Sequence, residues 1–138
     1  GRSSGTFAPD APMTREMLTA VLARLDGVEA SGGAAYDAGM RWAVAQGISD
    51  GRNPAGRVTR EQIAAMLYRY AGEPAVGGGL SFTDAASVSG YAQKAVRWAV
   101  EQGILTGYQD RTLAPQRTAT RAQVAAMLTR YIRTQADN

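Results

Sequence analysis

The 138-residue sequence contains no cysteine and no histidine, and its only lysine is Lys94. Without cysteine the chain forms no disulfide and no thiolate metal site. Without histidine it lacks the commonest metal ligand and the usual general base of an enzyme. No apolar run approaches the roughly 18 residues of a membrane helix. We therefore expect no metal, no cofactor and no membrane span.

The charged residues give no sign of catalysis or of nucleic-acid binding. The twelve Asp and Glu are dispersed, whereas a glycosidase needs two carboxylates held about 5–10 Å apart across a cleft. The net charge is only +3 and is spread along the chain, which is modest for nucleic-acid binding. Because nearly all the positive charge is arginine, the composition favours planar, bidentate recognition of carboxylate or phosphate.

A long repeat organises the chain. The phrase Trp-Ala-Val-x-Gln-Gly-Ile occurs at Trp42–Ile48 and again at Trp98–Ile104. Each copy is followed by Pro-x4-Thr-Arg, and a third such signal, Pro9 to Arg15, has no tryptophan phrase before it. Such self-similarity is typical of repeat architectures. We interpret residues 1–138 as one domain of three units: 1–27, which is the second half of the first unit, then 34–72 and 80–133.

Each Thr-Arg pair is expected to open an amphipathic helix. Apolar residues recur at i, i+3, i+4 and i+7: Leu18, Val21, Leu22, Leu25; Ile63, Met66, Leu67, Tyr70; Val124, Met127, Leu128, Tyr131. The threonine suits the N-cap, and Gln62 and Gln123, but not Met17, can complete a capping box. The tryptophan phrases end a second helix type, at about 36–46 and 91–102, with a glycine as C-cap. The predicted fold class is all-α.

The last unit resembles the S-layer homology (SLH) motif over its whole length. It has Phe82-Thr83-Asp84, Tyr91 where the pattern usually has tryptophan, Gly103-Ile104-Leu105-Thr106-Gly107, Leu113-Ala114-Pro115 and Thr120-Arg121-Ala122-Gln123. The middle unit keeps Gly47-Ile48-Ser49-Asp50-Gly51 and Thr59-Arg60-Glu61-Gln62, but it lacks Phe-x-Asp and its loop is five residues shorter. The first unit keeps only Gly5-Thr6-Phe7-Ala8-Pro9 and Thr14-Arg15-Glu16-Met17.

This resemblance implies a pseudo-threefold arrangement of helix–loop–helix units with the Thr-Arg helices in the centre. It implies a non-covalent anchor on the surface of Gram-positive bacteria. In the family, secondary cell-wall polysaccharide, often bearing pyruvate ketals, binds in grooves between motifs, and the Thr-Arg arginine is a principal ligand residue. The glutamate usual at the fourth motif position is replaced by Met17, Gln62 and Gln123. The alternative is therefore a degenerate module that binds no glycan and serves as a spacer or protein-interaction surface.

The candidate ligand residues are Arg15, Arg60, Arg121, Asp84, Tyr91, Gly51, Gly107, Gln62 and Gln123. Arginine at a helix start is opposed by the helix dipole by up to about 1 kcal/mol. An anion held by the guanidinium together with the free helix N–H groups would turn this position into a site. The alternative is a pair with a carboxylate of a neighbouring unit, such as Asp84 or Glu101. We rank Arg60 and Arg121 before Arg15.

Several other residues have two interpretations. Trp42 and Trp98 suit sugar stacking, but their apolar neighbours favour packing, and Tyr91 remains open between the two roles. Gly51 and Gly107 suit a tight turn or a positive φ, and in the resemblance they also let a ligand approach the backbone. Asp84 suits a cap of the turn before its helix, or a bond to a sugar hydroxyl.

The first unit lacks its first helix, because only four residues precede Gly5. A threefold arrangement would then expose apolar surface. We expect a neighbouring chain, or a missing segment of a longer protein, to complete this unit.

Overall fold

The computed structural model describes residues 11–29, 33–79 and 81–136, so the predicted signal at Gly5–Pro9 lies outside the described residues. In this part of the chain the elements are α1 (Arg15–Leu25), α2 (Gly33–Ala45), α3 (Arg60–Tyr70), the 3-10 turns η1 (Ala85–Ser87) and η2 (Gly90–Ala92), α4 (Gln93–Glu101) and α5 (Arg121–Ala136). Only isolated β-bridges, and no strands, occur among these residues. The all-α prediction is confirmed.

The starts of the Thr-Arg helices follow the capping signals. Thr59 and Gln62 form the complete capping box at α3. At α5 the same exchange occurs between Thr120 and Gln123, at 3.0 and 3.1 Å. At α1 the Thr14 side chain accepts a hydrogen bond from the backbone N–H of Met17. The methionine side chain cannot make the second hydrogen bond of a capping box. Polar side chains therefore fix all three entries, and α1 is fixed least.

The second helix type differs from its predicted bounds. Helix α2 begins three residues earlier than expected, at Gly33, and α4 is preceded by a 3-10 turn that contains Tyr91. Both helices end where a glycine follows, since Gly47 and Gly103 adopt φ values of 75° and 76°. A left-handed residue after the last turn is a common helix stop and favours glycine.

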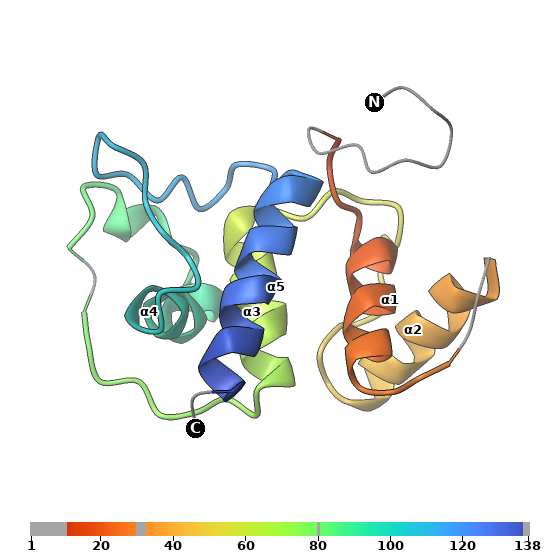
Figure 1. Ribbon diagram of the computed structural model, residues 1–138. Coiled ribbons are helices and arrows are strands. Elements are labelled where there is room, and N and C mark those ends of the chain that lie inside the picture. The colour runs from red at the N-terminus through yellow and green to blue at the C-terminus, as the bar shows by residue number, and fades with distance from the viewer. Residues whose placement is uncertain (1–10, 30–32, 80, 137–138) are drawn as a thin grey trace.

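A ring of three backbone hydrogen bonds joins the helix entries. Met13 donates to the carbonyl of Ala119 (3.3 Å), Ala119 donates to that of Val58 (3.0 Å), and Val58 donates to that of Met13 (2.9 Å). Each of these residues precedes an N-cap threonine, so the three units are joined in a closed cycle. Helices α1, α3 and α5 consequently start at the same end, with α2 and α4 on opposite outer sides (Figure 1).

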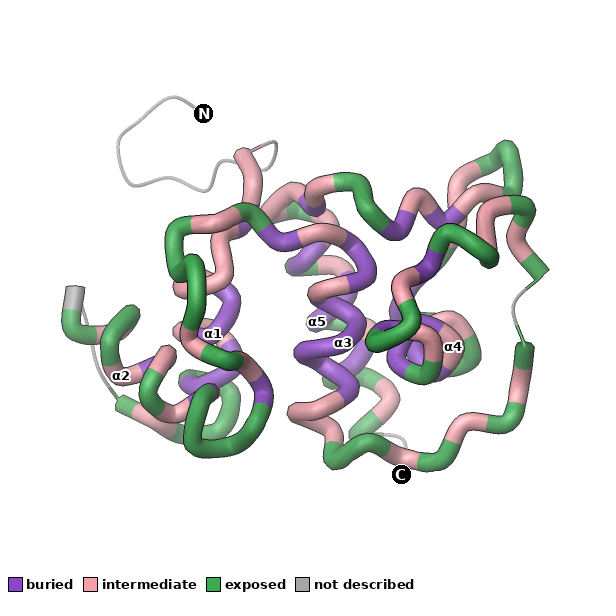
Figure 2. The backbone as a smooth tube through the Cα atoms, turned by 180° about the vertical axis from the view of Figure 1, so that it is seen from behind, coloured by how far each residue is buried: buried purple, intermediate pink, exposed green. Residues whose placement is uncertain are grey.

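The core lies along the inner faces of these helices (Figure 2). The largest fully buried side chains include Leu18, Leu22, Ile48, Ile63, Leu67, Val96, Ile104, Leu113 and Val124. The predicted apolar stripes supply five of them, namely Leu18, Leu22, Ile63, Leu67 and Val124, and Leu25, at the end of α1, is the stripe member that is exposed. Both isoleucines of the repeated tryptophan phrase belong to this core.

The two tryptophans pack against aromatic neighbours. Trp98 is buried, with its ring centroid 5.5 Å from that of Tyr68 and 6.1 Å from that of Tyr131. The ring centroid of Trp42 is 5.9 Å from that of Tyr70, which in turn is 6.0 Å from that of Tyr131. Tilted and edge-on arrangements of this kind stabilise aromatic clusters. The geometry therefore supports packing at both tryptophans.

Helix α5 exposes a face that the other two Thr-Arg helices bury. Ala64 of α3 is buried beside α4, and Thr19 of α1 is buried beside α2. The residue at the same position of α5, Ala125, is exposed, as is Thr129 one turn later. Helix α2 packs against α1 and α4 packs against α3, but among the described residues no helix packs on this face of α5. Completion of the first unit by a neighbouring chain or a missing segment stays a prediction.

Candidate functional site

A groove of about 530 Å³ opens beside the start of α1. Its lining comes from all three units: Arg15; Gly47, Ile48, Ser49 and Asp50 after α2; Gln62, Ala65, Met66 and Arg69 of α3; and Tyr91 before α4. We call this the Arg15 groove. It brings together three of the predicted ligand residues, namely Arg15, Gln62 and Tyr91.

A smaller hollow of about 250 Å³ occupies the equivalent place one unit further on. Its lining is Arg60; Leu105, Thr106, Gly107 and Tyr108 after α4; and Gln123, Ala126, Met127 and Arg130 of α5. We call this the Arg60 hollow. Gln62, Ala65, Met66 and Arg69 line the first site where Gln123, Ala126, Met127 and Arg130 line the second, so the two sites are copies of one design.

The first backbone N–H of each Thr-Arg helix is already bonded to the next unit. The donor–acceptor pairs, 2.9–3.0 Å apart, are Arg15–Gly56, Arg60–Arg117 and Arg121–Ala11. The residue after each N-cap therefore has no free N–H to offer an anion. For these N–H groups, the expectation that an anion binds them together with the guanidinium is wrong.

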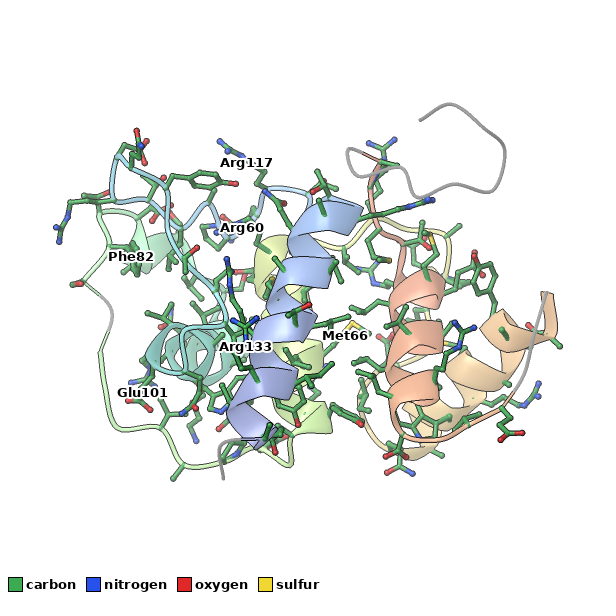
Figure 3. All side chains as sticks on the ribbon, viewed as in Figure 1. Arg60, Met66, Phe82, Glu101, Arg117 and Arg133 are labelled. Carbon is green, nitrogen blue, oxygen red and sulfur yellow. The ribbon has the colours of Figure 1, made fainter. Side chains whose placement is uncertain are left out.

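Arg60 is held firmly inside its hollow and is only 5% exposed. Its Nε donates to the carbonyl of Leu113 and its Nη2 to that of Thr106, both at 2.7 Å. The ring of Tyr108 lies over the guanidinium, 4.8 Å from Cζ to the ring centroid. Figure 3 shows Arg60 next to Arg117, beside the loop formed by residues 108–114. Burial lowers the pKa of Arg60, and the side chain meets backbone carbonyls instead of the carboxylate partner that one interpretation expected.

Loop length explains why the site beside Arg15 is larger than the site at Arg60. Two residues, Arg52 and Asn53, lie between Gly51 and Pro54, whereas residues 108–114 lie between the corresponding Gly107 and Pro115. The longer loop turns back through a hydrogen bond from the Tyr108 N–H to the carbonyl of residue 112, at 2.9 Å, and brings its tyrosine over Arg60. Arg15 lies beside Gly56, just after the short loop, and is half-buried.

Asp84 fastens the long loop. Its carboxylate accepts hydrogen bonds from the backbone N–H groups of Leu113 (2.8 Å) and Ala114 (2.9 Å), and it makes no cap bond at the turn that follows it. The expected capping role is therefore wrong. Burial opposes ionisation of this carboxyl, but the two hydrogen bonds, aided by the charge of Arg60, lower the pKa of Asp84 below its usual value.

The two predicted glycines are needed for different reasons. Gly51 has a φ of 78°, as expected for a residue in a left-handed turn. Gly107 does not adopt a positive φ. A Cβ at Gly107 would collide with the Phe82 ring and with the carbonyl of Thr112. Close packing of an aromatic ring, and not backbone conformation, requires the second glycine.

Arg121 lies at the third junction, between α5 and α1. Its Nη2 is 3.9 Å from the sulfur of Met17, and its buried Nε has no hydrogen-bond partner among the described residues. Gln123 is also predicted to bind ligand. Its side-chain oxygen accepts a hydrogen bond from the backbone N–H of Thr120, and its Nε2 donates to the Tyr108 hydroxyl at 3.3 Å. Neither residue lines the Arg15 groove.

Sequence reasoning missed a second arginine in each site. Arg69 donates from Nη1 to the carbonyl of Ile48 at 3.0 Å, and Arg130 does the same to Ile104 at 3.2 Å. These bonds hold the loop after α2 against α3, and the loop after α4 against α5. The signal was present, because Arg69, Arg130 and also Arg24 each lie nine residues after a Thr-Arg arginine.

Two other kinds of site find no support in the described part of the chain. None of its helices has the length and apolar character needed to cross a bilayer. Among the same residues, no three Asp and Glu side chains gather as metal ligands would.

Comparison with known proteins gives a family match and several relatives. Residues 81–125 match the model of the S-layer homology domain. The chain is 32% identical to an endoglucanase of Bacillus sp. (strain KSM-635), 30% to an amylopullulanase of Thermoanaerobacterium thermosulfurigenes and 29% to the exoglucanase XynX of Acetivibrio thermocellus. Each alignment covers 93% of the chain, but only 16%, 8% and 14% of the respective relative. The chain thus spans a small part of the length of the curated relatives it matches.

Proposed function

Because the chain belongs to the S-layer homology family of bacterial cell-surface proteins, we propose that it binds an anionic secondary wall polysaccharide and so anchors a larger protein. We assign the contact to the Arg15 groove. The observation that carries this assignment is the contrast between two sites of one design: about 530 Å³ beside Arg15, and about 250 Å³ at Arg60, where a tyrosine and two carbonyls occupy the guanidinium.

The side chains of the Arg15 groove suit an acidic sugar. Arg15 and Arg69 approach from two helices and offer planar donors for a carboxylate, such as that of a pyruvate ketal. Asp50 can accept hydrogen bonds from sugar hydroxyls. Tyr91 adds an aromatic ring, 55% exposed. Partial burial of its hydroxyl, with Glu61 nearby, raises the pKa of Tyr91, so the phenol remains a neutral donor at physiological pH.

We propose no catalytic role for the chain. The relatives are an amylopullulanase, an endoglucanase and an exoglucanase, but the chain corresponds to only 8–16% of their length. This share fits an attached binding module of a longer protein.

A structural role is the second candidate function. The burial of Arg60 and its two hydrogen bonds to carbonyls favour this role at the Arg60 hollow. A guanidinium whose Nε and Nη2 donate to the carbonyls of Leu113 and Thr106 holds two units together without a ligand. We therefore propose that the Arg60 hollow is structural and that the Arg15 groove binds glycan.

The test is a titration with fragments of pyruvylated secondary polysaccharide released from Gram-positive walls. Replacing Arg15 by alanine should weaken binding about tenfold or more, because a charge-assisted bidentate contact is lost. The matched control is Arg133→Ala on the exposed end of α5, which removes the same charge away from the groove. Equal affinity of Arg15→Ala and Arg133→Ala would contradict the assignment.

A further inference from the structure

A second hollow of about 340 Å³ adjoins the Arg15 groove. It is formed by the later part of α3 and the first part of α4, and it shares Ala65, Arg69 and Tyr91 with the groove. The two hollows therefore adjoin at these three residues, with the exposed Tyr91 common to both linings.

The second hollow is basic. Lys94 and Arg97 of α4 line it together with Arg69 of α3, and Glu73 is the one acidic residue in its lining. Lys94 is exposed. Arg97 is half-buried, and its Nε donates to the carbonyl of Gln93 at 3.4 Å. Three cations facing one carboxylate favour an anionic occupant.

Packing does not demand the charge of Lys94, as the first copy of the same helix pair shows. Counting from the repeated tryptophans, Lys94 corresponds to Ala38 of α2. The hollow between α1 and α2 has an apolar lining of Met13, Met17, Ala20, Val21, Ala35 and Tyr36, with Arg24 as its charged member. A helix pair of this kind thus packs with alanine at the position where the sequence places its only lysine.

We propose that the hollow lined by Lys94 and Arg97 is a second subsite, which binds an oxyanion substituent on a neighbouring sugar of the glycan held by Arg15. The inference rests on the proposed function and extends it. A glycan would cross Tyr91 with a sugar ring against the aromatic face, and consecutive acidic groups would reach Arg15 and Lys94. Recognition would then depend on chain length as well as on the terminal acidic group.

The experiment compares two probes from pyruvylated wall polysaccharide, the single repeating unit and a fragment of two or three units. The variants are the double substitution Lys94→Ala and Arg97→Ala, and a control double substitution Arg41→Ala and Arg133→Ala. The control removes the same charge, and Arg41 occupies in α2 the position of Arg97 in α4. Both are measured at low and moderate salt, after thermal unfolding has shown that the variants fold equally well.

The wild-type chain should bind the longer fragment about tenfold more tightly than the single unit, as two partly exposed ionic contacts allow. The Lys94/Arg97 variant should lose this gain and keep its affinity for the single unit, while the control keeps both. Equal affinity of the wild type for the two probes, or a full gain in the Lys94/Arg97 variant, would overturn the second subsite alone. Failure of the wild type to bind either probe would overturn the proposed function and this extension together.

Discussion

Tyr108 covers the guanidinium of Arg60 and also that of Arg117, with Cζ-to-centroid distances of 4.8 and 4.9 Å. The loop beside Arg15 supplies no such ring, because only Arg52 and Asn53 lie between Gly51 and Pro54. Burial opposes ionisation of the phenol, but the hydrogen bond from Arg117 and the charge of Arg60 lower the pKa of Tyr108. The tyrosine, two arginines and the Gln123 amide form a polar cluster that closes the hollow from within the chain.

Replacing Tyr108 by alanine should therefore affect stability and not glycan binding. We expect a loss of about 1–3 kcal/mol, from two cation–π contacts and the packing of the ring. Urea unfolding measures the loss, and titration with the single repeating unit checks the affinity. A variant that unfolds like the wild type, or that binds glycan much more weakly, would contradict the structural role of Tyr108.

The two equivalent arginines should respond in opposite ways to truncation. Arg60→Ala leaves the carbonyls of Leu113 and Thr106 without their donor, which should cost roughly 2–4 kcal/mol of unfolding free energy. Arg15→Ala should cost less than about 0.5 kcal/mol and reduce glycan affinity. Denaturant unfolding of both variants provides the comparison. If Arg15→Ala proves the more destabilising of the two, the distinction between the sites is wrong.

Asp84 should make the chain sensitive to acid. Its pKa is lower in the folded than in the unfolded chain, so its stabilising effect is present above the unfolded pKa of about 3.9 and is lost as the pH falls through the folded value. Asp84→Asn should be less stable than the wild type at pH 7. Its melting temperature should also fall less steeply between about pH 5 and pH 2. Parallel pH profiles would show that Asp84 does not fasten the loop.

Gly107 should tolerate no larger residue while Phe82 is present. Gly107→Ala should destabilise the chain by about 1–3 kcal/mol, because its Cβ overlaps the Phe82 ring and the loop backbone. Gly77→Ala is the matched control, since nothing lies within 4 Å of a Cβ there. If Phe82→Ala does not lessen the cost of Gly107→Ala in a double-mutant cycle, the ring is not the cause.

The sequence predicted the local structure better than it predicted the site. Helix class and capping at Gln62 and Gln123 follow from short-range patterns and are found, as are the buried stripes apart from Leu25, which is exposed. The accessibility of the arginines does not follow from such patterns. Arg60 and Arg15 stand in the same motif, and only the seven residues that follow Gly107 bury one of them. The partners of Asp84 are also 29 and 30 residues away, beyond any local rule.

The most direct test of the central claim uses the chain labelled with nitrogen-15 and titrated with the single repeating unit of pyruvylated wall polysaccharide. The segments 47–50 and 103–106 occupy equivalent places beside Arg15 and Arg60, and each reports on its own site. The account predicts amide shift changes at 47–50, Gln62 and Tyr91, with none at 103–106. Changes confined to 103–106 and Gln123 would contradict it.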